Sequence, residues 1–294
     1  MPKKSTVLSK TPPERIVQLI EADLTDDGVK YTEGCFYADT GYGKNCLVAF
    51  IQPEGDLLII PKPIQHLHHL SKVRDIKRLI VKGDLLYSGF NSANENTFEE
   101  IVFEGESDTH GIGGSAFSNS CALKRVKLPR GLAVLSYNTF EGCCALTDIE
   151  IPDTVTTIYS GAFQGCTSLQ HLSFPSVTAL GSAFRGCTSL KELTVPDGVT
   201  ALSQHCFQHC TALAEVSLPA TLTKIHHTAF EHCPALKRVV FRGSKQAWER
   251  VEKGDWVETV TNHYDNSRVG YDYADVSRDF HRLELRDISI EFME

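Results

Sequence analysis

The chain has 294 residues, a formal net charge of −8 at pH 7, 41% hydrophobic residues and 22% charged residues. This balance is typical of a folded globular protein, and no apolar run approaches the roughly 18 residues of a membrane span. The acidic charge argues against nucleic acid as a partner, because binding to phosphate requires a basic surface.

The first ten residues are basic, but the roughly 7–15 apolar residues of a secretory signal do not follow them. The chain as it stands therefore predicts a cytoplasmic protein. Removal of a signal peptide from a longer precursor would leave the same sequence, and in that case we expect a cell-surface or secreted protein.

Residues 1–75 are predicted to form an N-terminal α/β cap. Thr11 and the two prolines after it predict a helix start, and an apolar stripe continues through residue 22. Residues 46–51 and 57–60 have the pattern of strands and predict a β-hairpin. We expect this segment to cover the open edge of the repeats that follow, and the alternative is a separate binding domain.

A repeat occupies residues 76–242. In its six clearest copies, a phenylalanine is followed by a leucine six residues later and by apolar residues nine and eleven residues later. A proline follows the second apolar residue in five copies and cannot donate to a β-ladder, so each copy predicts one short strand. The phenylalanines are Phe117, Phe140, Phe163, Phe184, Phe207 and Phe230, at intervals of 23, 23, 21, 23 and 23 residues.

A unit of this length cannot bury its apolar face alone, so neighbouring units must stack and share a continuous core. Weaker copies of the strand at residues 76–81 and 98–103 bring the expected number of turns to eight. The sequence therefore predicts an α/β repeat solenoid with short parallel strands, turns of roughly 23 residues and a cap at each end.

Two segments show the repeat without a gap: Gly161–Leu169 reads Gly-Ala-Phe-Gln-Gly-Cys-Thr-Ser-Leu, and Ser182–Leu190 has the same pattern. This pattern resembles the BspA-type leucine-rich repeat, and the resemblance covers about residues 76–264. Trp248 and the pair His263-Tyr264 are similar to the usual C-terminal closure of that family. The resemblance implies a bacterial, often surface-exposed, ligand-binding leucine-rich repeat solenoid without catalytic residues. A bacterial cell-surface adhesin or host-interaction protein is therefore one alternative function.

Six of the ten cysteines fall at nearly one position of the repeat, which packing explains best. A buried thiol behaves as a small apolar group, and a stacked solenoid needs the same volume at the same place in each turn. Parallel stacking points neighbouring Cβ atoms in the same direction, which disfavours a disulfide, so we expect reduced thiols. The six are Cys121, Cys143, Cys166, Cys187, Cys210 and Cys233.

Two further segments follow the last strand. Residues 243–264 contain both tryptophans of the chain, Trp248 and Trp256, and are predicted to close the core as a C-terminal cap. Residues 265–294 are aromatic and acidic, with alternating apolar residues near the end, and predict a β tail packed on the solenoid or on a partner.

No group of residues predicts a cofactor or a metal. An enzyme with a site in the N-terminal cap is the second alternative, since Cys35 or Cys46 could act as a nucleophile beside a histidine such as His66, but no recognised signature surrounds either thiol. His209 and His232 hold one repeat position, which predicts stacked surface rings that could share a transition metal, but three earlier turns have glycine there. The wider histidine cluster also contains His205, His226 and His227.

The remaining candidate is the surface formed by strand residues that flank the inward apolar pair. It is polar and banded by charge, which suits a protein partner of complementary potential. Aromatic anchors are frequent in the tail, so we expect the tail to contribute. The sequence thus predicts a non-enzymatic scaffold for a protein partner or a second copy of the chain. The predicted contact residues are Arg125, Lys127, Asp148, Glu150, Glu192, Glu215, Arg238, Tyr271, Tyr273 and Phe280.

Overall fold

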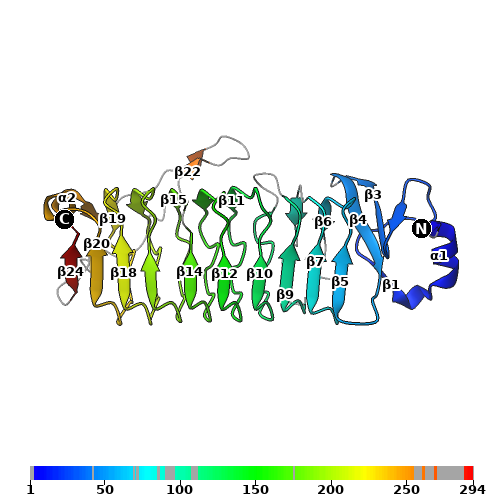
Figure 1. The fold of residues 1–294 in the computed structure, drawn as a ribbon, viewed down its shortest axis with the longest axis horizontal. Helices are drawn as coiled ribbons and strands as arrows, with labels where there is room; N and C mark the ends of the chain where they lie inside the picture. The colour runs from blue at the N-terminus through cyan, green and yellow to red at the C-terminus, as the bar shows by residue number, and fades with distance from the viewer. Residues whose placement is uncertain are drawn as a thin grey trace.

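The computed structural model shows a chain wound into a row of stacked turns, with the N-terminal region at one end and the last turns at the other (Figure 1). Strands of successive turns lie side by side along the length of the molecule. The structure describes residues 3–41, 43–68, 70, 73–84, 87–89, 97–106, 112–174, 176–254, 260–261, 268–269 and 288–293.

Each turn contributes one strand to a parallel face, which we call the strand face. Among the described residues it contains eight strands from β7 (Arg78–Val81) to β20 (Arg238–Phe241), which confirms the predicted number of turns. β5 (Leu57–Ile60) continues the face before β7, and β24 (Ser289–Phe292) continues it after β20. The strands in between are β9 (Glu100–Phe103), β10 (Arg125–Lys127), β12 (Asp148–Glu150), β14 (His171–Ser173), β16 (Glu192–Thr194) and β18 (Glu215–Leu218).

The return path of the turns carries shorter strands, which also pair in parallel with those of neighbouring turns. Little helix accompanies them, since α1 (Lys4–Lys10) and α2 (Lys245–Arg250) are the α-helices of the described residues. The architecture is therefore a β-solenoid. The return strands are β11 (Val134–Leu135), β13 (Thr157–Ile158), β15 (Ala179–Leu180), β17 (Ala201–Leu202), β19 (Lys224–His226) and β21 (Glu252–Gly254).

The core contains a stack of phenylalanine rings, one from each of six turns. Neighbouring ring centres lie 5.2–5.6 Å apart, and their planes are inclined by only 3–13°. Because each inner ring contacts a ring on both sides, the turns stabilise one another. Phe230 is partly buried, and the other five side chains are buried: Phe117, Phe140, Phe163, Phe184 and Phe207.

A ladder of thiols runs beside the rings. In five turns, the cysteine three residues after the phenylalanine donates its S–H to the carbonyl oxygen of the phenylalanine one turn earlier, over 3.0–3.2 Å. Burial raises the pKa of these thiols, to about 11 for Cys233. The column therefore links the turns by hydrogen bonds in addition to filling space. It consists of Cys143, Cys166, Cys187, Cys210 and Cys233.

Cys121 does not belong to this thiol ladder, contrary to the prediction. Its side chain is exposed, and the buried Ser120 occupies the ladder position of its turn. Cys121 stands four residues after Phe117 rather than three, and this one-residue offset places its thiol on the outer side of the turn.

The N-terminal region forms a sheet of its own. β3 (Cys35–Thr40) and β4 (Gly43–Ile51) pair antiparallel within it. Leu47 and Phe50 of β4 belong to the same hydrophobic core as the stacked turns, so the two sheets are packed together. The remaining strands of this sheet are β1 (Ile16–Gln18), β2 (Lys30–Thr32), β6 (His66–His68) and β8 (Tyr87–Gly89).

Two predictions for the N-terminal region are wrong. The residues after Thr11 do not form the expected helix: η1 (Pro13–Arg15) is a short 3-10 turn, and β1 follows it and pairs with β4. The expected hairpin of residues 46–51 and 57–60 does not form either, because β5 pairs with β7 as the first strand of the strand face. In both cases, pairing with strands distant in the sequence overrides the local pattern.

The C-terminal end of the row contains α2. The Ser244 hydroxyl caps this helix by accepting the N–H of Ala247 at 3.2 Å. Trp248 is buried, and its ring centre lies 5.2 Å from that of Phe241, whereas Trp256 lies outside the described residues. Pairing of β24 with β20 confirms that part of the tail packs on the solenoid as a strand.

β22 (Val260–Thr261) and β23 (Arg268–Val269) form a further antiparallel pair after α2. The strands of the tail therefore do not all belong to the strand face. The segment boundaries predicted at residues 75, 242 and 264 stay predictions.

Replacing Phe163 by alanine should lower the free energy of unfolding by about 3–5 kcal/mol, because the change removes ring contacts with the turns on both sides. Urea unfolding followed by circular dichroism measures this loss. Phe230→Ala is the control, since Phe230 stacks on Phe207 alone among the described rings and is only partly buried. Equal losses at the two positions would contradict the stacked core.

Candidate protein-binding face

One repeat is two residues shorter than its neighbours, and both sheets are interrupted there. The interval from Phe163 to Phe184 is 21 residues, whereas the other intervals are 23 residues. Compared with those repeats, one residue is missing between β14 and β15, and one is missing between β15 and Phe184. In the part of the chain that the structure describes, β14 and β16 are edges of two separate sheets, and so are β15 and β17. The interruption of both sheets therefore coincides with the shorter path between these two turns.

The opposite side of the same two turns stays bonded. The N–H of Phe163 donates to the carbonyl of Ala183 at 2.9 Å, and the N–H of Gly165 donates to the carbonyl of Arg185 at 2.8 Å. The rings of Phe163 and Phe184 remain stacked at 5.4 Å. The turns are therefore joined behind the strand face, although their strands do not pair on it.

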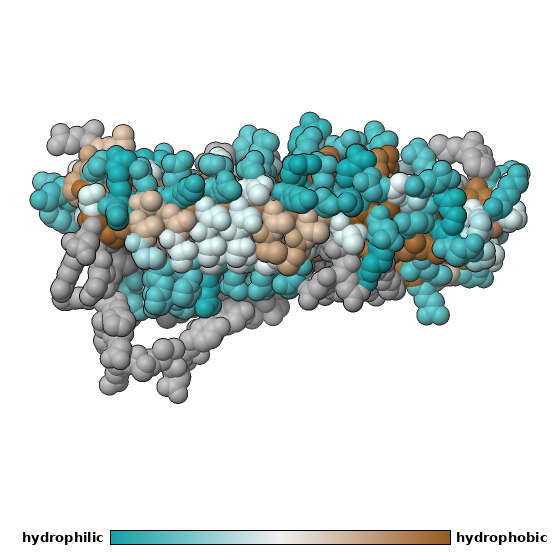
Figure 2. Space-filling view, turned by 90° about the horizontal axis from the view of Figure 1, so that it is seen from below, coloured by the Kyte–Doolittle hydropathy of each residue, from teal (hydrophilic) through white to brown (hydrophobic). Residues whose placement is uncertain are grey.

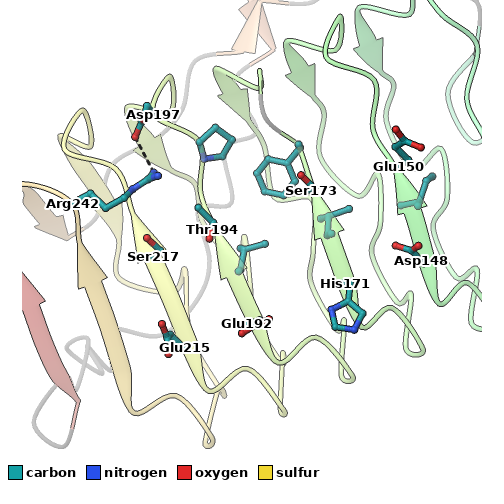
Figure 3. Close-up of a pocket in the computed structure, with 15 residues that line it drawn as sticks. Asp148, Glu150, His171, Ser173, Glu192, Thr194, Asp197, Glu215, Ser217 and Arg242 are labelled. Carbon is teal, nitrogen blue, oxygen red and sulfur yellow. Dashed lines mark ion pairs between the residues drawn. The ribbon is translucent and has the colours of Figure 1, made fainter. Parts of the chain in front are cut away.

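A hollow of about 740 Å³ lies over this interruption, on strands β12 to β18 (Figure 3). Leu172 in its floor is half-buried, whereas the corresponding Ile149 and Leu193 of the neighbouring strands are buried. The facing edges of β14 and β16 also add backbone N–H and C=O groups, because a strand edge exposes these groups. The hollow thus combines an apolar floor with polar backbone.

The charge around the hollow is predominantly negative. Asp148 and Glu150 project from β12 and Glu192 projects from β16, and all three side chains are exposed (Figure 3). Among the described residues, none of these three carboxylates forms an ion pair. Their charge is therefore available to a partner.

One rim of the hollow is held by a contact that crosses two turns. Arg242 lies just after β20, and its guanidinium contacts Asp197 at 3.0 Å and donates to the carbonyl of Val195. Neither Arg242 nor Asp197 was predicted from the sequence. No sequence signal would have joined them, because they are not at equivalent repeat positions and lie outside the strands.

Two arginines that were expected to anchor a partner are already paired within the chain. Arg238 contacts Glu215 at 2.8 Å and binds Glu291 of β24 through two N–H groups, at 2.7 and 2.9 Å. These bonds, first that to Glu291, raise the pKa of Arg238, and the same pair lowers the pKa of Glu291. Arg125 similarly contacts Glu100 at 3.2 Å.

The seven contact residues predicted on strands all flank inward apolar residues of the strand face, as expected. The structure brings Asp148, Glu150, Glu192 and Glu215 together at the hollow. Tyr271, Tyr273 and Phe280 lie outside the described residues. On β10, β12, β16, β18 and β20 the predicted residues are Arg125, Lys127, Asp148, Glu150, Glu192, Glu215 and Arg238.

The N-terminal thiols lie in a different environment. Cys46 is paired in register with His66 on the neighbouring strand, but its side chain is buried, and its S–H donates to the carbonyl of Gly43 at 3.2 Å. Burial raises the pKa of Cys46, and it raises that of Cys35 to about 12. A nucleophilic thiol requires the opposite shift, so this arrangement does not favour the hypothesis of an enzyme.

The predicted histidine pair is stacked. The ring centres of His209 and His232 lie 4.6 Å apart with 8° between their planes. Both residues have a positive φ, 61° for His209 and 59° for His232, and φ is also positive, at 69–74°, for Gly142, Gly165 and Gly186 at the same repeat position. Glu231 is 3.8 Å from His232, and no group of three or more potential metal ligands occurs among the described residues.

The repeats match a known family model. Residues 89–183 and 176–250, more than half of the chain, match the BspA type leucine rich repeat region in six copies. The chain belongs to the BspA-type leucine-rich repeat family. No curated protein is detectably similar in sequence. Among the described residues, no helix has the length and apolarity needed to cross a lipid bilayer.

Solved structures with a similar fold include three bacterial leucine-rich proteins. The T. pallidum protein TpLRR is 22% identical, with 76% of this chain and 86% of that chain covered and a TM-score of 0.46. A protein from Bacteroides ovatus is 20% identical, with coverages of 75% and 71% and a TM-score of 0.46. A leucine rich cell surface protein from Faecalibacterium prausnitzii is 14% identical, with coverages of 78% and 99% and a TM-score of 0.33.

Restoring the short BspA-type repeat to its usual length should close the strand face. One residue is inserted between Ser176 and Val177 and one between Gly181 and Ser182, so that β14 and β16 regain ladder register. We expect slower hydrogen exchange of backbone amides in residues 192–194, because pairing protects them. Two residues inserted between Asp26 and Asp27, far from the hollow, provide the control. Unchanged exchange in residues 192–194 would mean that repeat length does not cause the interruption.

Proposed function

We propose that this chain is a non-enzymatic scaffold that binds a protein partner through its strand face and C-terminal tail, centred on the hollow. The hollow carries this proposal, because it places exposed carboxylates around an apolar floor and beside two strand edges. Family membership supports a repeat scaffold, and repeat solenoids use their extended surfaces for binding.

The charge of the hollow defines the chemistry of the partner. Asp148, Glu150 and Glu192 form no ion pair among the described residues, although Arg125 and Lys127 lie on the neighbouring strand β10, whereas Arg238 and Arg242 are paired with Glu215, Glu291 and Asp197. A segment rich in lysine or arginine complements this arrangement. A partner of opposite charge is therefore favoured over a second copy of this acidic chain.

The partner's backbone also finds complementary groups. An extended segment lying across the hollow can form hydrogen bonds with backbone groups that the interrupted ladder leaves without a strand partner on β14 and β16. Leu172 offers an apolar contact at the base. The proposal thus assigns affinity to backbone and apolar contacts, and selectivity to charge.

The tail contributes at the C-terminal end of the same face. β24 extends the strand face beyond β20, and the bonds between Arg238 and Glu291 fix this extension. Arg125, Lys127 and Arg238 form the outer limits of the proposed contact area. Tyr271, Tyr273 and Phe280 precede β24 in the chain and are proposed as aromatic anchors.

The negative charge of the hollow is tested with a fluorescent peptide rich in lysine and arginine. The triple variant Asp148→Lys, Glu150→Lys, Glu192→Lys should bind this peptide about tenfold more weakly or worse, since each 1.4 kcal/mol lost is a factor of ten. The variant Glu21→Lys, Asp27→Lys, Glu249→Lys makes the same change in net charge elsewhere and should keep most of the affinity. An equal loss of peptide affinity in both variants would mean that net charge alone determines binding, and it would overturn the proposed site.

The tail is tested by exchanging its aromatic anchors. The variant Tyr271→Ala, Tyr273→Ala, Phe280→Ala should capture less of the partner from a lysate of the source cell, because aromatic anchors dominate many interfaces. Circular dichroism should show an unchanged thermal transition. Undiminished capture, with the partner identified by mass spectrometry, would remove the tail from the binding site.

A further inference from the structure

Two of the five cysteines outside the thiol ladder, Cys121 and Cys144, form a pair on the outer side of the turns. Cys121 is exposed and Cys144 is half-buried. Each stands four residues after the phenylalanine of its turn, directly after the ladder position held by Ser120 or Cys143. They therefore occupy the same place in two successive turns.

The turns hold these two cysteines next to each other. The sulfur of Cys144 lies 3.8 Å from the carbonyl oxygen of Cys121, and the sulfur of Cys121 lies 3.4 Å from the carbonyl oxygen of Gly142. β10 and β12, which follow the two turns, pair in register. Stacked strands are about 4.7–4.9 Å apart, which lies within the range of about 4.4–6.8 Å between the Cα atoms of a disulfide.

The outer side of the turns is accessible to small molecules. Figure 2 shows the molecule from the side at which the turns enter the strands, with a weakly polar to apolar band running along it between hydrophilic rims. The next two turns place Thr167 and Thr188 at the position of Cys121 and Cys144, and each threonine hydroxyl donates to the carbonyl one turn earlier. Cys121 and Cys144 are therefore followed, at the same position of the next two turns, by hydroxyl side chains that do not undergo thiol exchange.

The ladder thiols behave differently. Cys143 is buried, and its S–H donates to the carbonyl of Phe117, which holds the sulfur inside the core. The parallel stacking that disfavours disulfides between neighbouring turns applies to these buried ladder thiols. Cys121 is exposed, so its sulfur can change rotamer without displacing core side chains, and the spacing of stacked turns lies within the Cα range of a disulfide.

We propose that Cys121 and Cys144 form a thiol modification site that reacts with low-molecular-weight disulfides and closes to an intramolecular disulfide between two successive turns. The Cys121 thiolate attacks one sulfur of the small disulfide, and a bond from Cys121 to that sulfur replaces the original one, releasing the first small thiolate. The Cys144 thiolate then attacks the Cys121 sulfur and releases the second. Two protein thiols lose two electrons and two protons, and the small disulfide is reduced to two thiols.

The environment of the pair sets the order of the two steps. Cys121 is the more exposed sulfur and meets the reagent first. The pKa of Cys144 is raised, first by the hydrogen bond with the Cys121 side chain and then by burial. Cys144 thus acts second, as the resolving thiol.

The test uses the full chain, reduced and then exposed to oxidised glutathione at neutral pH. Threonine is the replacement, because it already occupies this position in the next turns. Peptide mapping by mass spectrometry should find a Cys121–Cys144 disulfide and no bound glutathione in the unmodified chain. Cys144→Thr should retain glutathione on Cys121, and the double variant Cys121→Thr, Cys144→Thr should lose the fast reaction in the native state.

Two outcomes would overturn the site. One is stable glutathione on Cys121 in the unmodified chain, to the same extent as in Cys144→Thr, since the second thiol then fails to close the bond. The other is a double variant that reacts as fast as the unmodified chain, because ladder thiols would then be the reactive ones. Circular dichroism before and after the reaction checks that each variant is folded. If the double threonine variant is not folded, the double serine variant Cys121→Ser, Cys144→Ser replaces it.

Discussion

The structure depends on the contact between consecutive turns, and one residue type supplies both parts of that contact. The phenylalanine ring stacks on the rings of neighbouring turns, while its backbone carbonyl accepts the thiol of the following turn, as Phe140 does from Cys166. Dispersion and hydrogen bonding therefore act at the same place. A turn taken alone loses both, because its ring and its carbonyl would face water or a void.

This dependence explains why the chain tolerates an interrupted sheet. The ring stack and the bonds behind it need only that each turn return its phenylalanine to the axis, and Phe163 and Phe184 remain 5.4 Å apart across the short repeat. The ladder of the strand face has a stricter requirement, since every residue must lie opposite its partner. At the short repeat the strand face is therefore interrupted while the core stays continuous.

Features that repeat could be predicted from the sequence, and features that occur once could not. The period of the phenylalanines predicts the number of turns and the outward position of residues such as Glu192. The strand β1 and the partner of β5 depend on contacts with distant strands, which a local pattern does not contain. The placement of Cys121 was missed because a one-residue offset changes the side of the turn to which a side chain points. The short interval itself was visible, but its effect on two sheets was not.

The hollow lies where one repeat is two residues shorter than its neighbours. Side chains around it decide what it attracts, whereas its position along the row is decided by which repeat is short. Relocating the two-residue deficit by a whole number of repeats would move the opening along the rod without redesigning the core. In a tandem-repeat gene, where copies are gained and lost as units, the location and the selectivity of such a recess can therefore evolve separately.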